Sequence, residues 1–146
     1  MAMGTQGLKF AVVLLSVNLL AVSSAAAHGA LAVGAPPDIA KGGLAVGYSW
    51  NQSAPGTAEA EALKQCLSFM DAPAETRALC KVVATTHNQC IAVAMDPAAG
   101  TEGFGWSVET SKQQASDFAL QKCRDTDGPE HEAACVVSDV KCDVTK

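Results

Sequence analysis

The chain contains an internal repeat, and this feature constrains its fold more than any other. Four short segments recur in the same order, about 55 to 60 residues further along. Leu-Ala-Val at residue 31 recurs as Ile-Ala-Val at residue 91, and Gly-Tyr-Ser at residue 47 recurs as Gly-Trp-Ser at residue 105. Ala-Leu-x-x-Cys begins at residues 62 and 119. Leu-Cys-Lys-Val-Val at residue 79 corresponds to Ala-Cys-Val-Val at residue 134. Because loop insertions produce small changes in offset, we predict two copies of one unit, at residues 28–88 and 89–146.

Each unit has the pattern of a strand, a second strand, a helix and a third strand. Around Tyr48 and Trp106, large apolar residues alternate with small ones, which is the period of a half-buried strand. Apolar residues then fall at helical spacing behind an N-cap, Thr57 in the first unit and Ser111 in the second. The predicted strands are 29–34, 44–50 and 79–87 in the first unit, and 90–95, 104–108 and 134–141 in the second.

These elements predict an α+β fold. We expect an antiparallel sheet of about six strands with both helices on one face, so that the two units form a single domain. Tyr48 and Trp106 occupy equivalent places on equivalent strands. Both rings are expected on the inward face, where they would fill the interface between the sheet and the helices.

Residues 1–27 have the three regions of a signal peptide. Lys9 is the only charged residue before an apolar run at 10–22, and small residues end the segment at Ala27. The apolar run is too short to span a bilayer comfortably. We therefore expect cleavage after Ala27, a mature chain that begins at His28 and has no membrane segment, and export to the periplasm or the medium.

Six cysteines remain in the mature chain, and an even count in an exported domain predicts three disulfides. Six cysteines allow fifteen pairings, which the repeat narrows. Cys66 and Cys80 occupy the same positions in the first unit as Cys123 and Cys135 in the second, so each pair would join the helix end to the returning strand. The predicted pairs are Cys66–Cys80, Cys123–Cys135 and Cys90–Cys142, the last of which is expected to connect the two units.

The combination of these segments resembles a bacterial secreted family known as domain of unknown function 4189. An export signal leads into Gly-Ala-Leu-Ala-Val, followed by the Gly-Tyr-Ser strand, a helix ending in Ala-Leu-x-x-Cys, and Cys-Lys-Val-Val. The resemblance covers most of residues 29–142. It implies an exported bacterial protein, and it implies no reaction, so no catalytic residue is assigned from it.

The remaining patterns argue against several classes of function. The net charge is −5 and no run of Lys or Arg occurs, which disfavours nucleic-acid binding. Gly105-Trp-Ser107 resembles half of a nucleophile elbow, but Glu109 stands where that turn needs a second glycine. No Cys-x-x-Cys and no phosphate-binding glycine loop are present. We predict no catalytic residue, no cofactor and no resident metal.

A metal-binding protein or a small secreted enzyme is the alternative hypothesis. After cleavage His28 would carry a free amine beside its imidazole, and these two groups with His87 or His131 could chelate copper. The acidic segment 125–132 contains Asp-x-Asp-Gly, as a calcium loop does, but it ends before the last ligand position of such a loop. A solvated acidic loop is the simpler interpretation.

The leading hypothesis is an exported, monomeric, disulfide-stabilised module of the bacterial envelope that binds a partner. The partner would be an envelope protein, a cell-wall polymer or a secreted enzyme that the module inhibits. Two irregular loops, 35–43 and 96–103, are rich in proline and glycine and are the expected contact surface. A passive envelope component with no specific ligand is the third possibility.

Overall fold

A computed structural model describes residues 27–143 of the chain. The predicted signal peptide lies outside the described residues except for Ala27. In chain order the elements are β1 (His28–Gly34), α1 (Ile39–Gly42), β2 (Ala45–Gln52), α2 (Pro55–Leu67), α3 (Ala74–Arg77), β3 (Lys81–His87), β4 (Cys90–Met95), β5 (Phe104–Glu109), α4 (Lys112–Asp127), a 3₁₀ turn η1 (Glu132–Ala134) and β6 (Val136–Cys142). Among the described residues, no helix is both long enough and apolar enough to cross a membrane.

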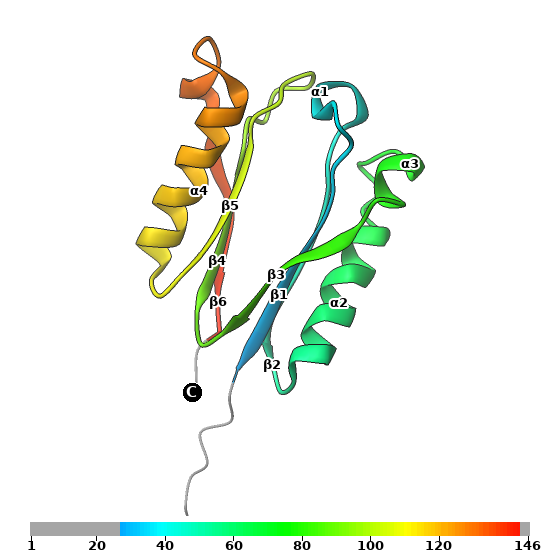
Figure 1. The fold of residues 1–146 in the computed structure, drawn as a ribbon, viewed down its shortest axis with the longest axis vertical. Helices are drawn as coiled ribbons and strands as arrows, with labels where there is room; N and C mark the ends of the chain where they lie inside the picture. The colour runs from blue at the N-terminus through cyan, green and yellow to red at the C-terminus, as the bar shows by residue number, and fades with distance from the viewer. Residues whose placement is uncertain (1–26, 144–146) are drawn as a thin grey trace, which may run out of the picture.

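The six strands form two antiparallel sheets of three strands each. Their orders are β2-β1-β3 and β5-β4-β6, so the first strand of each unit is the central strand of its own sheet. The sheets lie face to face, and α2 and α4 cover their outer faces (Figure 1). The molecule therefore has four layers, in the order helix, sheet, sheet, helix.

The α+β class, the six strands and the duplicated order of elements are confirmed, with one correction. The strands do not form a single sheet with both helices on one face. The cause lies in the central strands, since nearly every residue of β1 and β4 is buried. A strand that is buried on both faces needs a layer on each side, and here one layer is a helix and the other is the opposite sheet.

The two kinds of interface differ in the size of their side chains. Between sheet and helix the buried residues of the first unit are small: Ala30, Ala32, Ala45, Ala58, Ala62 and Cys66 among them. Between the sheets they are large: Leu31, Val33, Val46, Ile91 and Val93, with Tyr48 and Trp106 packed against them. The prediction that Tyr48 and Trp106 fill the sheet–helix interface is therefore wrong. Their rings face the opposite sheet, because a helix this close to its sheet leaves no space for an aromatic side chain.

The three disulfides follow the pairing expected from the repeat. Cys66–Cys80 and Cys123–Cys135 join the end of each long helix to the segment that leads into the last strand of its unit. Cys90–Cys142 joins β4 to its neighbour β6. The expectation that this third bond connects the two units is wrong, since both strands belong to the second sheet.

The starts of the two long helices differ from each other. Ser111 caps α4, and its hydroxyl accepts a hydrogen bond from the Gln114 amide at 3.2 Å, as expected. In the first unit Thr57 is not the cap, since α2 already begins at Pro55. Proline is favoured at the first helical position because its missing N–H would have no partner there.

Candidate functional site

The two loops that were expected to form a contact surface lie side by side. Each connects the first two strands of its unit, and the face-to-face packing of the sheets brings both to the end of the molecule opposite the described chain ends (Figure 1). A cleft of about 310 Å³ lies between them. Its lining is mainly apolar and includes Ile39, Leu44, Pro73, Met95 and Ala98.

A carboxylate from one loop holds the other loop in place. Glu102 accepts hydrogen bonds from the backbone amides of Ile39 at 3.2 Å and Ala40 at 3.0 Å. Asp38 accepts from the Lys41 amide at 3.0 Å and so closes the short α1 turn. Both walls of the cleft are therefore fixed by hydrogen bonds before any ligand arrives.

A pair of carboxyl groups lies at one side of the cleft. Asp96 lines the cleft and is buried, and it contacts Asp127 at the end of α4. One oxygen of each carboxyl group is buried without a hydrogen-bond partner among the described residues. Burial, and next the negative charge of Asp96, raise the pKa of the Asp127 carboxyl, while nearby His131 lowers it. Because two like charges in contact repel each other, the neighbouring carboxyl group disfavours the charged form of Asp127, and the contact places the loop against the end of α4.

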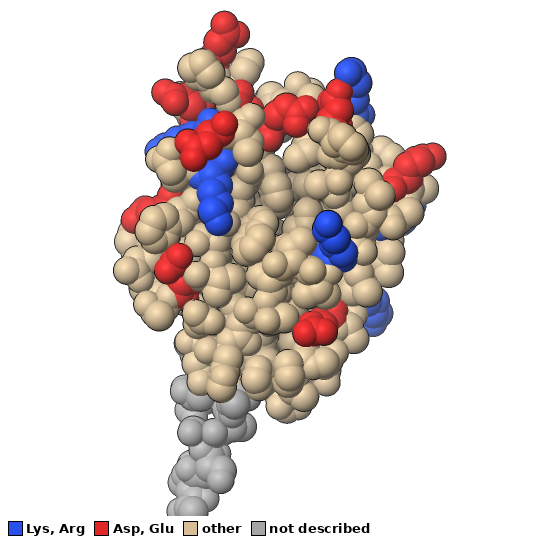
Figure 2. Space-filling model, viewed as in Figure 1, with Lys and Arg blue, Asp and Glu red and all other residues tan. Residues whose placement is uncertain are grey.

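This contact also accounts for part of the acidic segment 125–132. The first three of its residues continue α4, so the segment is shorter as a loop than predicted. Glu130 and Glu132 are exposed, as expected for a solvated acidic surface. Acidic side chains gather at the loop end of the molecule on the face that Figure 2 shows.

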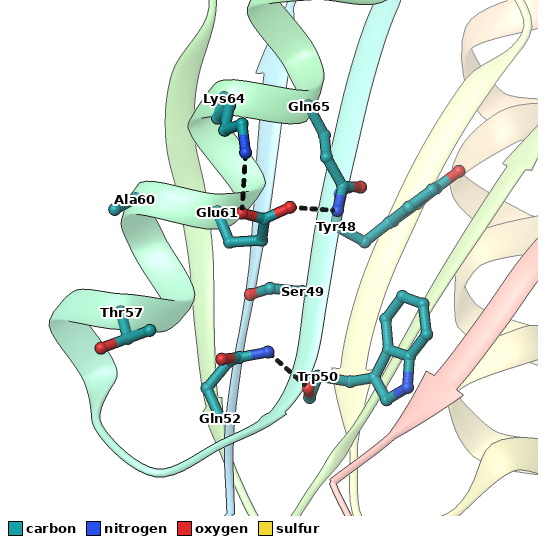
Figure 3. Close-up of a pocket in the computed structure, with 9 residues that line it drawn as sticks. All are labelled: Tyr48, Ser49, Trp50, Gln52, Thr57, Ala60, Glu61, Lys64 and Gln65. Atoms are coloured by element: carbon teal, nitrogen blue, oxygen red, sulfur yellow. Dashed lines mark hydrogen bonds and ion pairs between the residues drawn. The ribbon is translucent and has the colours of Figure 1, made fainter.

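A second groove runs between β2 and α2. It encloses about 420 Å³ and is lined by Tyr48, Trp50, Glu61, Lys64 and Gln65, together with smaller side chains. Figure 3 shows that its polar residues bond to one another: Glu61 accepts from Gln65 at 3.0 Å and pairs with Lys64 at 3.8 Å. The Tyr48 and Trp50 rings point away from α2 (Figure 3). The groove therefore offers few free polar groups to a ligand.

Tyr48 is the only tyrosine of the chain, which makes its ionisation measurable. Burial, and next the charge of Asp139, raise its pKa to about 12. In the unfolded chain a tyrosine titrates near 10. The folded state then favours the neutral phenol, and this stability is complete below pH 10 and is lost between pH 10 and about 12. We expect a tyrosinate absorbance midpoint well above 10 in the native protein, and near 10 in guanidinium. Equal midpoints would contradict the burial of Tyr48.

The other residues singled out in the sequence do not form a catalytic group. Ser107 is buried in β5 and donates a hydrogen bond to Glu109 at 3.1 Å. Ser49, its counterpart in β2, donates to the Ala58 carbonyl at 2.7 Å and so anchors α2 to the sheet. Both serines have structural partners, and neither is bonded to a histidine.

The three histidines separate into a pair and a single residue. His28 and His87 are neighbours across β1 and β3, and their ring centroids are 4.8 Å apart. His131 follows α4 and lies beside Asp127, at the far end of the domain. Within residues 27–143, no three His, Cys, Asp or Glu side chains gather in a way that could hold a metal ion.

Three features of the cleft were not predicted: the Glu102 contact, the carboxyl pair and the meeting of the two loops. Each joins residues that are far apart in the sequence.

The family described as domain of unknown function (DUF4189) matches residues 28–142. The chain belongs to this family. The match spans both units of the DUF4189 domain and all six cysteines, which confirms the resemblance found in the sequence. No curated protein and no solved structure matches the chain.

Proposed function

We propose that this DUF4189 domain is an exported binding module that holds an apolar side chain of a partner protein in the cleft between loops 35–43 and 96–103. The observation that carries the proposal is the cleft itself, which neither unit forms alone. A volume of about 310 Å³ is at the small end of the range for ligand sites. That space fits one or two apolar anchor residues of a partner.

The lining favours a protein partner over a cell-wall polymer. Sugars are commonly bound by stacking on exposed aromatic rings and by many polar groups, whereas the residues around this cleft include no aromatic side chain. Asp96 and Glu102 place acidic groups at the apolar lining, whereas the Asp38 carboxylate is paired with Lys41. A partner that presents basic residues beside its apolar anchor would complement this surface in charge.

The fixed geometry of the loops supports tight binding. Ordering a loop on association costs free energy, and a cleft that is already ordered avoids this cost. Here the two amide hydrogen bonds that Glu102 accepts, together with the Asp96–Asp127 contact, order both walls. The three disulfides favour an oxidising compartment, which supports export together with the signal-like residues 1–27.

Site-specific photo-crosslinking in the native host tests this function. A photoreactive amino acid at exposed Ala98, in the cleft, is expected to capture one discrete protein, and the same residue at Ala133 is the matched control outside it. With the captured protein purified, Ile39→Asp should weaken its binding at least about tenfold, because central apolar anchors dominate interface energies. Identical crosslinks from both positions, or unchanged affinity for Ile39→Asp, would contradict the proposal.

A further inference from the structure

The end of the domain that carries the described chain ends holds a pair of histidines with a defined geometry. His28 is the first residue of β1, the central strand of its sheet, and pairs with Gln52 on one side and His87 on the other. Opposite residues of an antiparallel pair project from the same face of the sheet. The two imidazole rings accordingly stack at 4.8 Å with an angle of 29° between their planes.

We propose that the mature chain, beginning at His28, binds one Cu²⁺ ion through its α-amino group and the imidazole rings of His28 and His87. Cleavage after Ala27 creates the amine. An N-terminal histidine can close a six-membered chelate ring through this amine and its own Nδ1, and the His87 ring then supplies a third nitrogen. Nitrogen donors of this kind suit copper, and Cu²⁺ binds a given protein site more tightly than the other divalent first-row transition metals do.

The distance between the rings fits a shared metal ion. Metal–imidazole bonds are about 2.0–2.1 Å long, so two nitrogens on opposite sides of one ion lie roughly 4 Å apart. The ring centroids are already 4.8 Å apart, so small side-chain rotations are expected to bring one nitrogen of each ring to this spacing. His87 is exposed and His28 is half-buried, so a hydrated ion can reach both without opening the fold.

Cleavage changes the contacts at the start of β1 and leaves His28 in place. Ala27 is held by two hydrogen bonds with Asn88, at 3.0 and 3.3 Å, which cleavage removes. His28 keeps its position through the pairing of β1 with both neighbouring strands.

Copper binding by the exported protein tests this site. The intact mass of the purified protein first establishes its N-terminal residue, which is expected to be His28. Titration with copper sulfate alone, followed by calorimetry and electron paramagnetic resonance, should then show one Cu²⁺ per chain with nitrogen ligands. His87→Ala should weaken binding by more than about tenfold, since even groups behind metal ligands contribute roughly 10–100-fold.

Two controls separate the site from general copper binding. His131→Ala removes a histidine at the far end of the domain and should leave the affinity unchanged. A form that retains residues 21–27 keeps both rings but has no amine at His28, and it should bind at least tenfold more weakly. If His87→Ala melts early, His87→Gln replaces it. A mature chain that begins elsewhere, or equal affinity of the protein and its His87 variants, would overturn the proposal. The site is distant from the loop cleft, so failure here leaves the proposed function unaffected.

Discussion

Reduction of the three disulfides is expected to unfold the domain at 25 °C. The bonds close loops between residues 14, 52 and 12 positions apart. In the chain-entropy model, loops of these lengths contribute about 3 kcal/mol each for the two short ones and about 4 kcal/mol for the long one. Together they amount to about 10 kcal/mol, whereas a whole domain of this kind is stable by only about 5–15 kcal/mol.

The core offers little to compensate for this loss. The layer between sheet and helix is built largely from alanine, and side chains this small remove little apolar surface from water. Circular dichroism with and without a phosphine reductant measures the effect. The double variant Cys66→Ala/Cys80→Ala isolates one short loop and should lower the free energy of unfolding by about 3 kcal/mol. A reduced protein that keeps a cooperative thermal transition above 40 °C would contradict the prediction.

The elements of the fold could be predicted because the sequence repeats its local patterns. The alternation around Tyr48 and Trp106 and the helical spacing behind Ser111 are signals within a few residues, and all of them correspond to observed elements. The cysteine pairs followed from equivalent positions in the two units. Local pattern and repeat were thus enough to predict the fold class and all three disulfide pairs.

The arrangement of the sheets could not be predicted from alternation alone. Alternation on β2 and β5 shows that a strand has two different faces, but it does not say what covers each face. The useful signal was in the other strands, since Leu31 and Ile91 belong to continuous apolar runs, which are typical of strands buried on both faces. Such runs indicate a layer on each side, as the structure shows.

The sheet pairing also corrects the alignment of the two units. The sequence matches Leu31 with Ile91, whereas the strand registers match Ala30 with Ala92, because each lies opposite the serine of the Gly-aromatic-Ser segment. The difference of two residues leaves every side chain on its predicted face, since faces alternate with a period of two. The contacts at the two candidate sites could not be predicted in this way. The contacts of Glu102 with Ile39 and of His28 with His87 depend on the tertiary arrangement, and no local sequence pattern predicts them.

Replacement of Gly105 by alanine is expected to destabilise the domain by about 3 kcal/mol or more. A side chain at this position would begin 2.3 Å from the Ala119 carbonyl oxygen and 2.5 Å from the Cys123 amide nitrogen. Both atoms belong to the backbone of α4, so no rotamer change can relieve the overlap, and the whole helix would have to move outward. Overpacking of a core typically costs 1–3 kcal/mol even where side chains can adjust.

Gly47 in the first unit has the same surroundings, at 2.2 Å from the Ala62 carbonyl oxygen, so Gly47→Ala should behave alike. Gly56→Ala is the matched control, because nothing lies within 4 Å of the added carbon. That change removes a flexible residue from α2 and should stabilise the protein by about 0.5–1 kcal/mol. Urea unfolding of the three variants measures the change in the free energy of unfolding, which should fall for Gly105→Ala and Gly47→Ala and rise for Gly56→Ala. A Gly105→Ala variant as stable as the wild type would show that the helix is not held against its strand, and the Gly-aromatic-Ser segment would then lack a structural reason to occur in both units.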